Sequence, residues 1–562
     1  MIVLPLLYAQ RLGAQWYTDA GLRENYFIDA VRCYNEGNYG EAARRFGVLT
    51  AAVPSDDAPH YYLGLIYAGR GEFDSAEKEL RQAVALDPGN FWYRYRLASL
   101  CAMTGRPELA EAEYKKLLED FPDKNDVYYN LIETYISESK LEEALGVLDK
   151  IETLYGRNEP TAMTRFEILG RLGREPEAYE SLENFNKEYS SPRVLAVLGD
   201  YQMSMYNDST ALAMYAEALD IEPGFAPAML GKAEVYRMTR KYDEYFRAAG
   251  EFFAAEDIPA AGKSDYLRNL VQRSDAGFVR TFAPRIGTLF NVCVGVHPSD
   301  STVLSTAGLY YYATGRGEES EAYFRKNMDS WPKSIAAAAE YNEVLMYLRR
   351  WEELSASAQA SFEKFPSEPA FLELAVLAEY NLKDYDAVIA LCDKIISAAP
   401  QDSARVLNAW STIGDTYHQK GDSKKAYKAY EKALKINPDY NNVLNNYAYW
   451  LSMDGKKLKK AYAMSRKTVT SEPDNPTYLD TFGWILYLQG KAVEAKPFFK
   501  HAMLYGGKDS AVILDHYAEV LYALGEYDTA FIYWNQAVAK NNAGEIPRLE
   551  EKIEARKAAA KK

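Results

Sequence analysis

Apolar residues between Leu407 and Tyr440 recur at helical spacing in two runs. The first run consists of Trp410, Ile413, Gly414 and Tyr417, most of which share one face of a helix. The second run consists of Ala426, Tyr430 and Ala433, spaced by four and three residues. Gly421 separates the two runs, and Pro438 ends the second because proline cannot continue a helix. The pattern predicts two antiparallel helices joined by a tight turn.

Small residues stand at the expected crossing point of these two helices. Gly414 lies on the first helix and Ala426 on the second. A larger side chain at a close crossing would force the helices apart. We therefore expect small residues to face each other there.

The same two-helix unit repeats along most of the chain. Successive units begin near Arg23, Asp57, Phe91, Asn125 and Glu159, each about 34 residues after the last. Alanine returns at the small position of the second helix at residues 42, 76, 110, 144, 178 and 211. The most regular units begin at Leu407, Asn441, Pro476 and Ala511. Counting in this way gives about fifteen units.

Eight residues of the unit from Leu407 to Tyr440 match a known repeat pattern. They are Trp410, Ile413, Gly414, Tyr417, Ala426, Tyr430, Ala433 and Pro438. In these positions the chain resembles the tetratricopeptide repeat family. The resemblance implies an all-α solenoid of about fifteen helical hairpins in a right-handed superhelix. It also implies a scaffold that binds partner proteins, and the chain is similar to large exported repeat proteins of Gram-negative, Bacteroidetes-like bacteria.

The regularity of the repeats varies along the chain and predicts two arms that meet at an irregular seam. The predicted parts are an N-terminal array at 11–256, a degenerate seam at 257–300, a middle array at 301–400, a regular C-terminal array at 401–543 and a capping helix at 544–562. Pro259 and Pro284 interrupt the seam, where only Ile286, Phe290 and Cys293 keep the spacing of a second helix. Residues 401–404 read as a small insertion that forms a second joint.

The first ten residues form a short apolar run that resembles the end of an export signal, with cleavage after Ala9. The basic start of such a signal is missing. Either the true start lies upstream or the run is a hydrophobic leader. Export predicts a periplasmic or envelope-associated protein, and the other reading predicts a cytoplasmic one.

Composition narrows the classes of function. Hydrophobic content of 48% and charged content of 26% are typical of a folded chain, and no apolar run is long enough to span a membrane. A net charge of −15 argues against nucleic acid as a partner, since binding phosphates requires a basic surface. Lysines on the outer face of the C-terminal units fit a solvated surface, so any membrane contact is peripheral. All four cysteines occupy core positions of their units and read as free, buried thiols.

An aromatic ladder marks the inward face of the N-terminal units. Phe27, Tyr61, Tyr95 and Tyr129 occupy the same position of successive units, with Trp92 on the same face. Aromatic rings offer a large contact area at low entropic cost, which suits a groove for an extended peptide or a partner helix. The same rings also suit packing between neighbouring repeats. Both readings stay open.

The equivalent face of the C-terminal units is acidic and aromatic. Its residues are Asp415, His418, Asn445, Tyr449, Asp480, Trp484, Tyr487, Asp515, Glu519 and Tyr522. Such a face predicts a partner that carries lysine, arginine or aromatic side chains, held by charge and by cation–π contacts.

Catalytic and cofactor motifs are absent from the sequence. The five histidines lack metal-ligand spacing, and residues 261–264 resemble a phosphate-binding loop only at their end. We therefore predict a non-catalytic protein without cofactors that binds partner proteins along its inner face, in envelope assembly or secretion. The alternative is a carrier or sensor for a glycan stacked on the N-terminal aromatic ladder.

Overall fold

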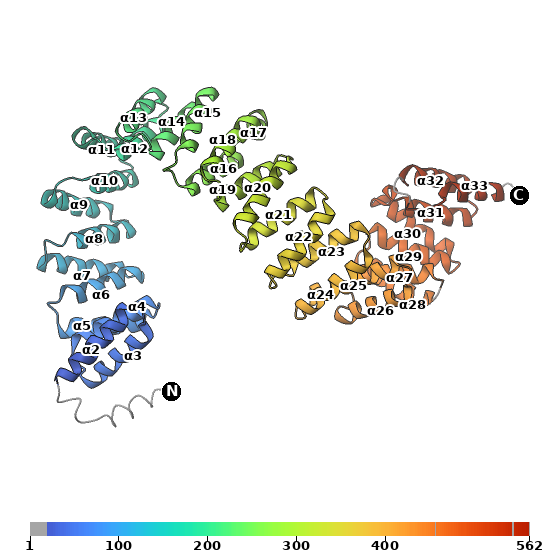
Figure 1. Cartoon of the computed structure of the whole chain (residues 1–562), viewed down its shortest axis with the longest axis horizontal. Helices are drawn as coiled ribbons and strands as arrows, with labels where there is room; N and C mark the ends of the chain where they lie inside the picture. Colours follow the sequence, from blue (N-terminus) through green and yellow to red (C-terminus); the bar gives the residue numbers. More distant parts are fainter. Residues whose placement is uncertain (1–19, 456, 542–544, 561–562) are drawn as a thin grey trace. The chain divides into compact units, whose positions relative to one another are not determined.

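The computed structural model describes residues 20–455, 457–541 and 545–560 (Figure 1). These residues form 32 α-helices and one short 3-10 helix, and they contain no β-strand. The prediction of an all-α array of helical hairpins is confirmed. The predicted leader at residues 1–10 lies outside the described residues.

The chain divides after Ile258 into two compact units. The described part of the first unit contains seven consecutive hairpins. Its helices are α2 (Ala20–Asn35), α3 (Tyr39–Ala52), α4 (Asp57–Gly69), α5 (Phe73–Leu86), α6 (Phe91–Met103), α7 (Pro107–Asp120), α8 (Asn125–Ser137), α9 (Leu141–Tyr155), α10 (Glu159–Arg171), α11 (Glu175–Tyr189), α12 (Pro192–Ser204), α13 (Asp208–Ile221), α14 (Ala226–Met238) and α15 (Tyr242–Ala254).

The second unit begins with a three-helix element, continues with seven hairpins and ends with a single helix. Its helices are α16 (Ala260–Arg273), α17 (Ala276–Thr281), α18 (Ala283–Val296), α19 (Ser301–Ala313), α20 (Gly317–Ser330), α21 (Ile335–Tyr347), α22 (Trp351–Lys364), α23 (Ala370–Leu382), α24 (Tyr385–Ala398), α25 (Ser403–Gln419), α26 (Ser423–Ile436), α27 (Asn441–Met453), α28 (Leu458–Ser471), α29 (Pro476–Leu488), α30 (Ala492–Leu504), η1 (Gly507–Asp509), α31 (Ala511–Ala523), α32 (Tyr527–Lys540) and α33 (Leu549–Ala560).

The two prolines expected to interrupt residues 257–300 stand at helix beginnings. Pro259 directly precedes α16, and Pro284 lies in the first turn of α18. Proline is tolerated at these positions because the first N–H groups of a helix have no intrahelical partner. Ile286, Phe290 and Cys293 are buried along α18, as the spacing of a second helix requires.

The inserted residues 401–404 lengthen a helix. Ser403 and Ala404 lie in the first turn of α25, which has 17 residues, whereas α27 has 13. The insertion therefore adds about one turn to the first helix of its hairpin.

The hairpin crossing differs from the expected contact of small with small. A Cβ atom built on Gly414 would lie 2.4 Å from the ring of Tyr430, sixteen residues later on α26. Gly308 meets Phe324 in the same way, and Gly483 meets Phe499. The small residue of the first helix therefore makes room for a large, buried side chain of the second.

The turn inside each hairpin uses a left-handed residue. Gly421, between α25 and α26, has φ +78°, which costs glycine little. Arg349 and Lys383 adopt φ of 55° and 62° at the corresponding turns of units without this glycine. The turn geometry is therefore kept even where it costs about 1 kcal/mol.

The prediction of buried, free thiols is confirmed for three of the four cysteines. Cys101, Cys293 and Cys392 are buried, Cys33 is half-buried, and all four are free. Burial raises the pKa of Cys392 to about 12, so its thiol stays protonated at neutral pH.

Replacing Gly414 with alanine tests the crossing. Because Tyr430 is fully buried, its ring cannot move aside freely, and we expect Gly414→Ala to lower the free energy of unfolding by about 1–3 kcal/mol. Gly146→Ala is the control, because a Cβ there meets nothing within 4 Å and should stabilise helix α9 by up to about 1 kcal/mol. Urea unfolding of both variants measures the difference. Equal effects would contradict this account of the crossing.

Candidate functional site

The predicted C-terminal site residues lie on the first helices of four consecutive hairpins. These helices are α25, α27, α29 and α31. They belong to the second unit, and their exposed faces enclose a hollow of about 690 Å³, which we call the C-terminal groove. Its lining includes the predicted residues Asp415, Asn445, Tyr449 and Asp480.

Twelve further residues that line the C-terminal groove were not predicted. They are Tyr380, Gln419, Asn446, Trp450, Pro476, Thr477, Thr481, Gly506, Asp509, Ser510, Val512 and Ile513. Asn446 and Trp450 directly follow predicted positions on α27, so a face one residue wider would have included them. Ser510 follows η1, a loop element that helical periodicity cannot place. An adjoining hollow of about 430 Å³ shares Tyr380 and Asp415 with the groove.

Asp415 is a largely buried carboxylate that neutral groups hold in place. It accepts hydrogen bonds from the Tyr430 hydroxyl at 2.6 Å and from the Asn446 amide at 3.1 Å. Burial raises the pKa of Asp415, because the charged form is poorly solvated. No lysine or arginine is among the residues that line the groove. The groove is therefore an acidic surface without a cation of its own.

Asn445 carries an unused acceptor in the same wall. Its side chain is 4% exposed, and its amide nitrogen lies 3.5 Å from Asn446 Oδ1. Its oxygen Oδ1 is buried and has no hydrogen-bond partner among the described residues. A buried acceptor without a partner costs about 1–3 kcal/mol, which a donor from a ligand would recover.

His418 contributes a ring face to this region. Its imidazole stacks on the indole of Trp450 with ring centroids 3.5 Å apart and planes at 18°. Burial lowers the pKa of His418, which favours the neutral ring at neutral pH. His418 therefore offers an aromatic contact more readily than a positive charge.

Asp480 is paired with a histidine that the sequence did not single out. His516 Nδ1 lies 2.9 Å from Asp480 Oδ1, and both side chains are 7% exposed. The His516 ring stacks on Trp484 at 3.9 Å. The only signal in the sequence is the spacing of the pair, which is one repeat plus two residues. The pair joins helices α29 and α31.

The predicted tyrosines of this region are half-buried. The Tyr449 ring lies 6.2 Å from His516, and burial raises the pKa of Tyr449 to about 12. The Tyr487 ring lies 5.0 Å from Trp484. Both hydroxyls therefore stay protonated near neutral pH and can each donate one hydrogen bond.

The predicted acids at the C-terminal end are neutralised by the chain itself. Lys552 on α33 lies 2.6 Å from Asp515 and 2.8 Å from Glu519. Arg556, one turn later, lies 2.8 Å from Glu519, and its backbone carbonyl accepts a hydrogen bond from Tyr522. Asp515 and Glu519 are therefore not open to a partner in this structure. The basic side chains that pair with them come from α33 of the same chain.

The N-terminal aromatic ladder lies in the first unit and packs between repeats. Phe27 contacts Phe46 and Tyr62 edge-on, with ring centroids 5.8 and 5.9 Å apart. The Tyr61 ring lies 4.8 Å from the ring of Tyr93 in the next hairpin. These contacts show that ladder rings serve packing.

The remaining ladder residues differ in exposure. The Tyr95 hydroxyl accepts a hydrogen bond from Asn130 at 2.8 Å. Tyr95 and Tyr129 are both half-buried and pack against one hydrophobic core cluster. Trp92 is 55% exposed and contacts Tyr95 edge-on. Trp92 alone among the predicted ladder residues offers most of its ring to solvent.

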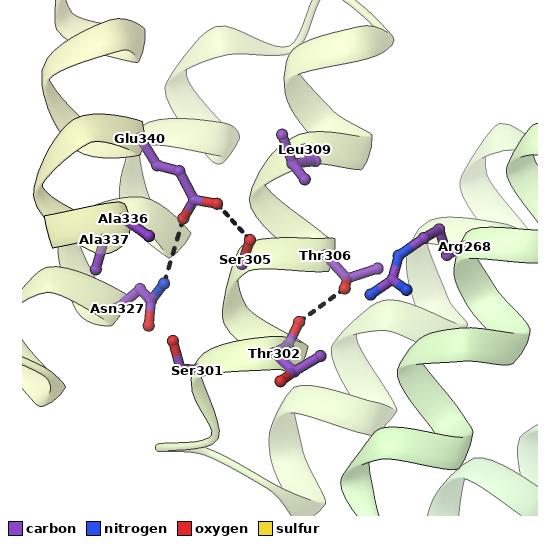
Figure 2. A pocket seen from close by; sticks show the side chains of 10 residues that line it. All are labelled: Arg268, Ser301, Thr302, Ser305, Thr306, Leu309, Asn327, Ala336, Ala337 and Glu340. Carbon is purple, nitrogen blue, oxygen red and sulfur yellow. Dashed lines mark hydrogen bonds between the residues drawn. The ribbon is translucent and has the colours of Figure 1, made fainter. Parts of the chain in front are cut away.

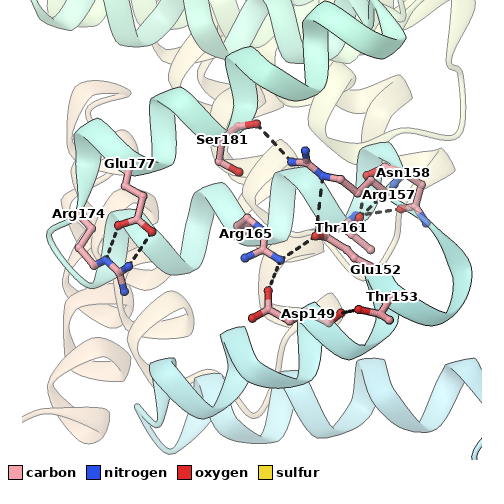
Figure 3. Close-up of polar contacts among 10 residues, drawn as sticks. All are labelled: Asp149, Glu152, Thr153, Arg157, Asn158, Thr161, Arg165, Arg174, Glu177 and Ser181. Atoms are coloured by element: carbon pink, nitrogen blue, oxygen red, sulfur yellow. Dashed lines mark hydrogen bonds and ion pairs between the residues drawn. The ribbon is translucent and has the colours of Figure 1, made fainter.

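A polar network that the sequence did not predict joins α9 to α10 in the first unit (Figure 3). Arg165 on α10 reaches back to Asp149 at 2.7 Å and Glu152 at 2.8 Å. Its side chain is 16% exposed, and the carboxylates belong to the preceding hairpin. The network therefore ties neighbouring hairpins together.

No group of three or more His, Cys, Asp or Glu side chains is arranged to hold a metal ion in the part of the chain that the structure describes. Among the same residues, no helix combines the length and apolar character needed to cross a bilayer.

Three family models match the chain, and each is described as tetratricopeptide repeat. They match residues 319–543, 67–125 and 34–91. The first match lies in the second unit, and the other two lie in the first.

Similar proteins come from bacteria, archaea and yeast. Cellulose synthase operon protein C of Salmonella typhimurium is 31% identical over 180 residues, which are 29% of this chain and 15% of that protein. A TPR repeat-containing protein of Methanocaldococcus jannaschii is 20% identical over 78% of this chain and 73% of its own length. Anaphase-promoting complex subunit CDC16 of Saccharomyces cerevisiae is 20% identical over 52% of this chain and 38% of its own.

Two solved structures align along the chain. A complex titled Naa15/Naa10 bound to HypK-THB has a chain with 12% identity and a TM-score of 0.33, and yeast Tom70 has 13% identity and a TM-score of 0.30. Each alignment covers 95% of this chain and 99% of the other.

Removing the cation that α33 supplies tests its role. Lys552→Ala removes one of the cations that pair with the buried Asp515 and Glu519. We therefore expect the free energy of opening of α31 to α33 to fall by about 2–4 kcal/mol. Lys557→Ala is the matched control, because Lys557 pairs only with Glu554 on its own exposed helix face and should cost less than about 0.5 kcal/mol. Hydrogen exchange of α31 to α33 measures both. Equal protection in the two variants would refute the role of Lys552.

Proposed function

Because the chain belongs to the tetratricopeptide repeat family, we propose that it is a non-catalytic scaffold that binds a partner protein through an extended basic segment in the C-terminal groove. Tetratricopeptide repeat proteins typically serve as scaffolds for protein interactions. The observation that carries the proposal is the groove itself. It is a hollow of about 690 Å³ that is lined by carboxylates, amides and rings and lacks lysine and arginine.

The charge of the groove favours a basic partner. Asp415 meets only neutral hydrogen-bond donors, so its charge is not cancelled locally. A lysine or arginine side chain from a partner would supply the missing cation and could also lie over the exposed face of a ring.

The amides of the groove favour a peptide. Asn445 has an unused buried acceptor, and Gln419 and Asn446 line the same hollow. An extended peptide presents backbone N–H and C=O groups that side-chain amides can satisfy along its length. The proposed ligand is therefore an extended segment that carries at least one lysine or arginine.

We place this binding in cell-envelope assembly or secretion, in a periplasmic or envelope-associated protein. The support is the similarity to cellulose synthase operon protein C of Salmonella typhimurium over 29% of this chain. The export signal expected at residues 1–10 also supports this setting and lies outside the described residues.

The alternative of a glycan stacked on the N-terminal ladder has less support. Phe27, Tyr61 and Tyr95 contact other side chains, and only Trp92 is largely exposed. A single exposed ring gives a glycan little stacking surface.

Asp415→Asn tests the proposal with peptides selected by display on the full chain. Asparagine keeps the shape and an acceptor for Tyr430 but removes the charge, so we expect affinity for basic peptides to fall about three- to tenfold. Fluorescence anisotropy with labelled peptides measures this, at low and high salt.

Asp393→Asn is the matched control, because Asp393 is exposed on α24 outside the residues that line the groove. It should leave the affinity unchanged. If the selected peptides are not basic, or if both variants weaken binding equally, the proposal fails.

A further inference from the structure

A third hollow lies in the second unit and shares no lining residue with the C-terminal groove. It has a volume of about 230 Å³ and lies between α16, α19 and α21, with one wall contributed by α20 (Figure 2). Its polar lining includes Arg268, Ser305, Asn327 and Glu340. We call it the α19–α21 hollow. None of the sequence-predicted site residues lines it.

Glu340 is a carboxylate without a cation. It accepts hydrogen bonds from the Ser305 hydroxyl at 2.5 Å and from the Asn327 amide nitrogen at 3.3 Å. No lysine, arginine or histidine among the described residues forms an ion pair with it. A carboxylate offers about four acceptor positions, so part of its capacity is unused. Burial also raises the pKa of Glu340, which reflects the cost of keeping this charge uncompensated.

Asn327 leaves a second acceptor beside this carboxylate. Its side chain is 1% exposed, and its oxygen Oδ1 is buried without a hydrogen-bond partner. Figure 2 shows the side chain between Glu340 and Ser301, with its nitrogen toward Glu340. The nitrogen has to face Glu340 because an ionised carboxylate only accepts hydrogen bonds. The oxygen is therefore the end that is left without a donor.

From this arrangement we propose that the α19–α21 hollow binds a primary ammonium group. An ammonium carries three donors and one positive charge, which match the uncompensated Glu340 carboxylate and the unpartnered Asn327 oxygen beside it. The volume, several times the roughly 30 Å³ share of one water molecule, accommodates the ammonium and part of its carbon stem. Leu309, Ala336 and Ala337 supply apolar contacts for that stem.

Arg268 sets the direction in which the group binds. Its guanidinium also lines the hollow and pairs with Asp265 on its own helix at 2.9 Å. Since like charges repel, the ammonium lies at the Glu340 side of the hollow. Removing the charge of Arg268 should therefore strengthen binding, an effect that damage to the fold would not produce.

This site does not depend on the C-terminal groove. The ammonium can come from a lysine side chain of a partner or from a free amino terminus. Both sources present the same chemistry, and small probes distinguish them without any peptide that the groove selects.

Saturation-transfer NMR on the full chain with three probes tests the proposal. Nα-acetyl-lysine methylamide carries a side-chain ammonium, glycinamide carries an α-ammonium, and Nα-acetyl-norleucine methylamide is the neutral match of the first. At least one of the two amines should bind at millimolar concentration, and the norleucine probe should not. Which amine binds identifies the source.

Three variants complete the test. Glu340→Gln keeps the shape and should weaken amine binding about tenfold or more. Arg268→Gln should strengthen it about two- to threefold. Glu363→Gln, the same change at an exposed residue of α22, should have no effect. The proposal is overturned if neither amine binds, if the norleucine probe binds equally well, or if Glu340→Gln leaves the affinity unchanged.

Discussion

The contact on which the structure depends is the insertion of one large side chain from the second helix of a hairpin into the gap left by a small residue of the first. Tyr430 fills the gap at Gly414, and its hydroxyl donates a hydrogen bond to Asp415 on the groove face. Tyr215 does the same at Gly199 and Asp200, with the hydroxyl 2.5 Å from the carboxylate. Trp534, sixteen residues after the small, buried Ala518, donates its indole N–H to Asp515. A packing requirement thus positions the carboxylates of the face that would meet a partner.

These carboxylates fall into two groups according to how their charge is met. Lys552 and Arg556 neutralise Asp515 and Glu519, and Asp480 is held by the His516 ring of the neighbouring first helix. Asp415 and Glu340 meet only neutral donors. The first group stabilises the stacking of hairpins. The second group leaves two places in the second unit where a positively charged partner would gain most.

The periodicity of the sequence predicted the fold, because the fold depends on the local spacing of apolar and small residues. Gly414, Tyr430 and their counterparts recur with the repeat, and the all-α array follows from them. Side-chain partners were harder to predict, since they join residues about one repeat apart whose rotamers the sequence does not encode. His516 was not identified as a site residue because its neighbours in sequence are apolar. The ion pairs that α33 makes with Asp515 and Glu519 depend on the side-chain conformation of Lys552, which the sequence does not encode. The aromatic ladder was left open between groove and packing, and the contacts of Phe27, Tyr61 and Tyr95 are packing contacts.

The central claim is that carboxylates of the second unit that form no ion pair with neighbouring hairpins make the surface that binds a basic partner. Hydrogen exchange of the full chain, with and without a saturating basic peptide, tests it most directly. The account predicts slower exchange in α25, α27 and α29, whose residues line the C-terminal groove, and no change in α4, α6 and α8. Slower exchange confined to α4, α6 and α8 would contradict it and would assign binding to the N-terminal ladder.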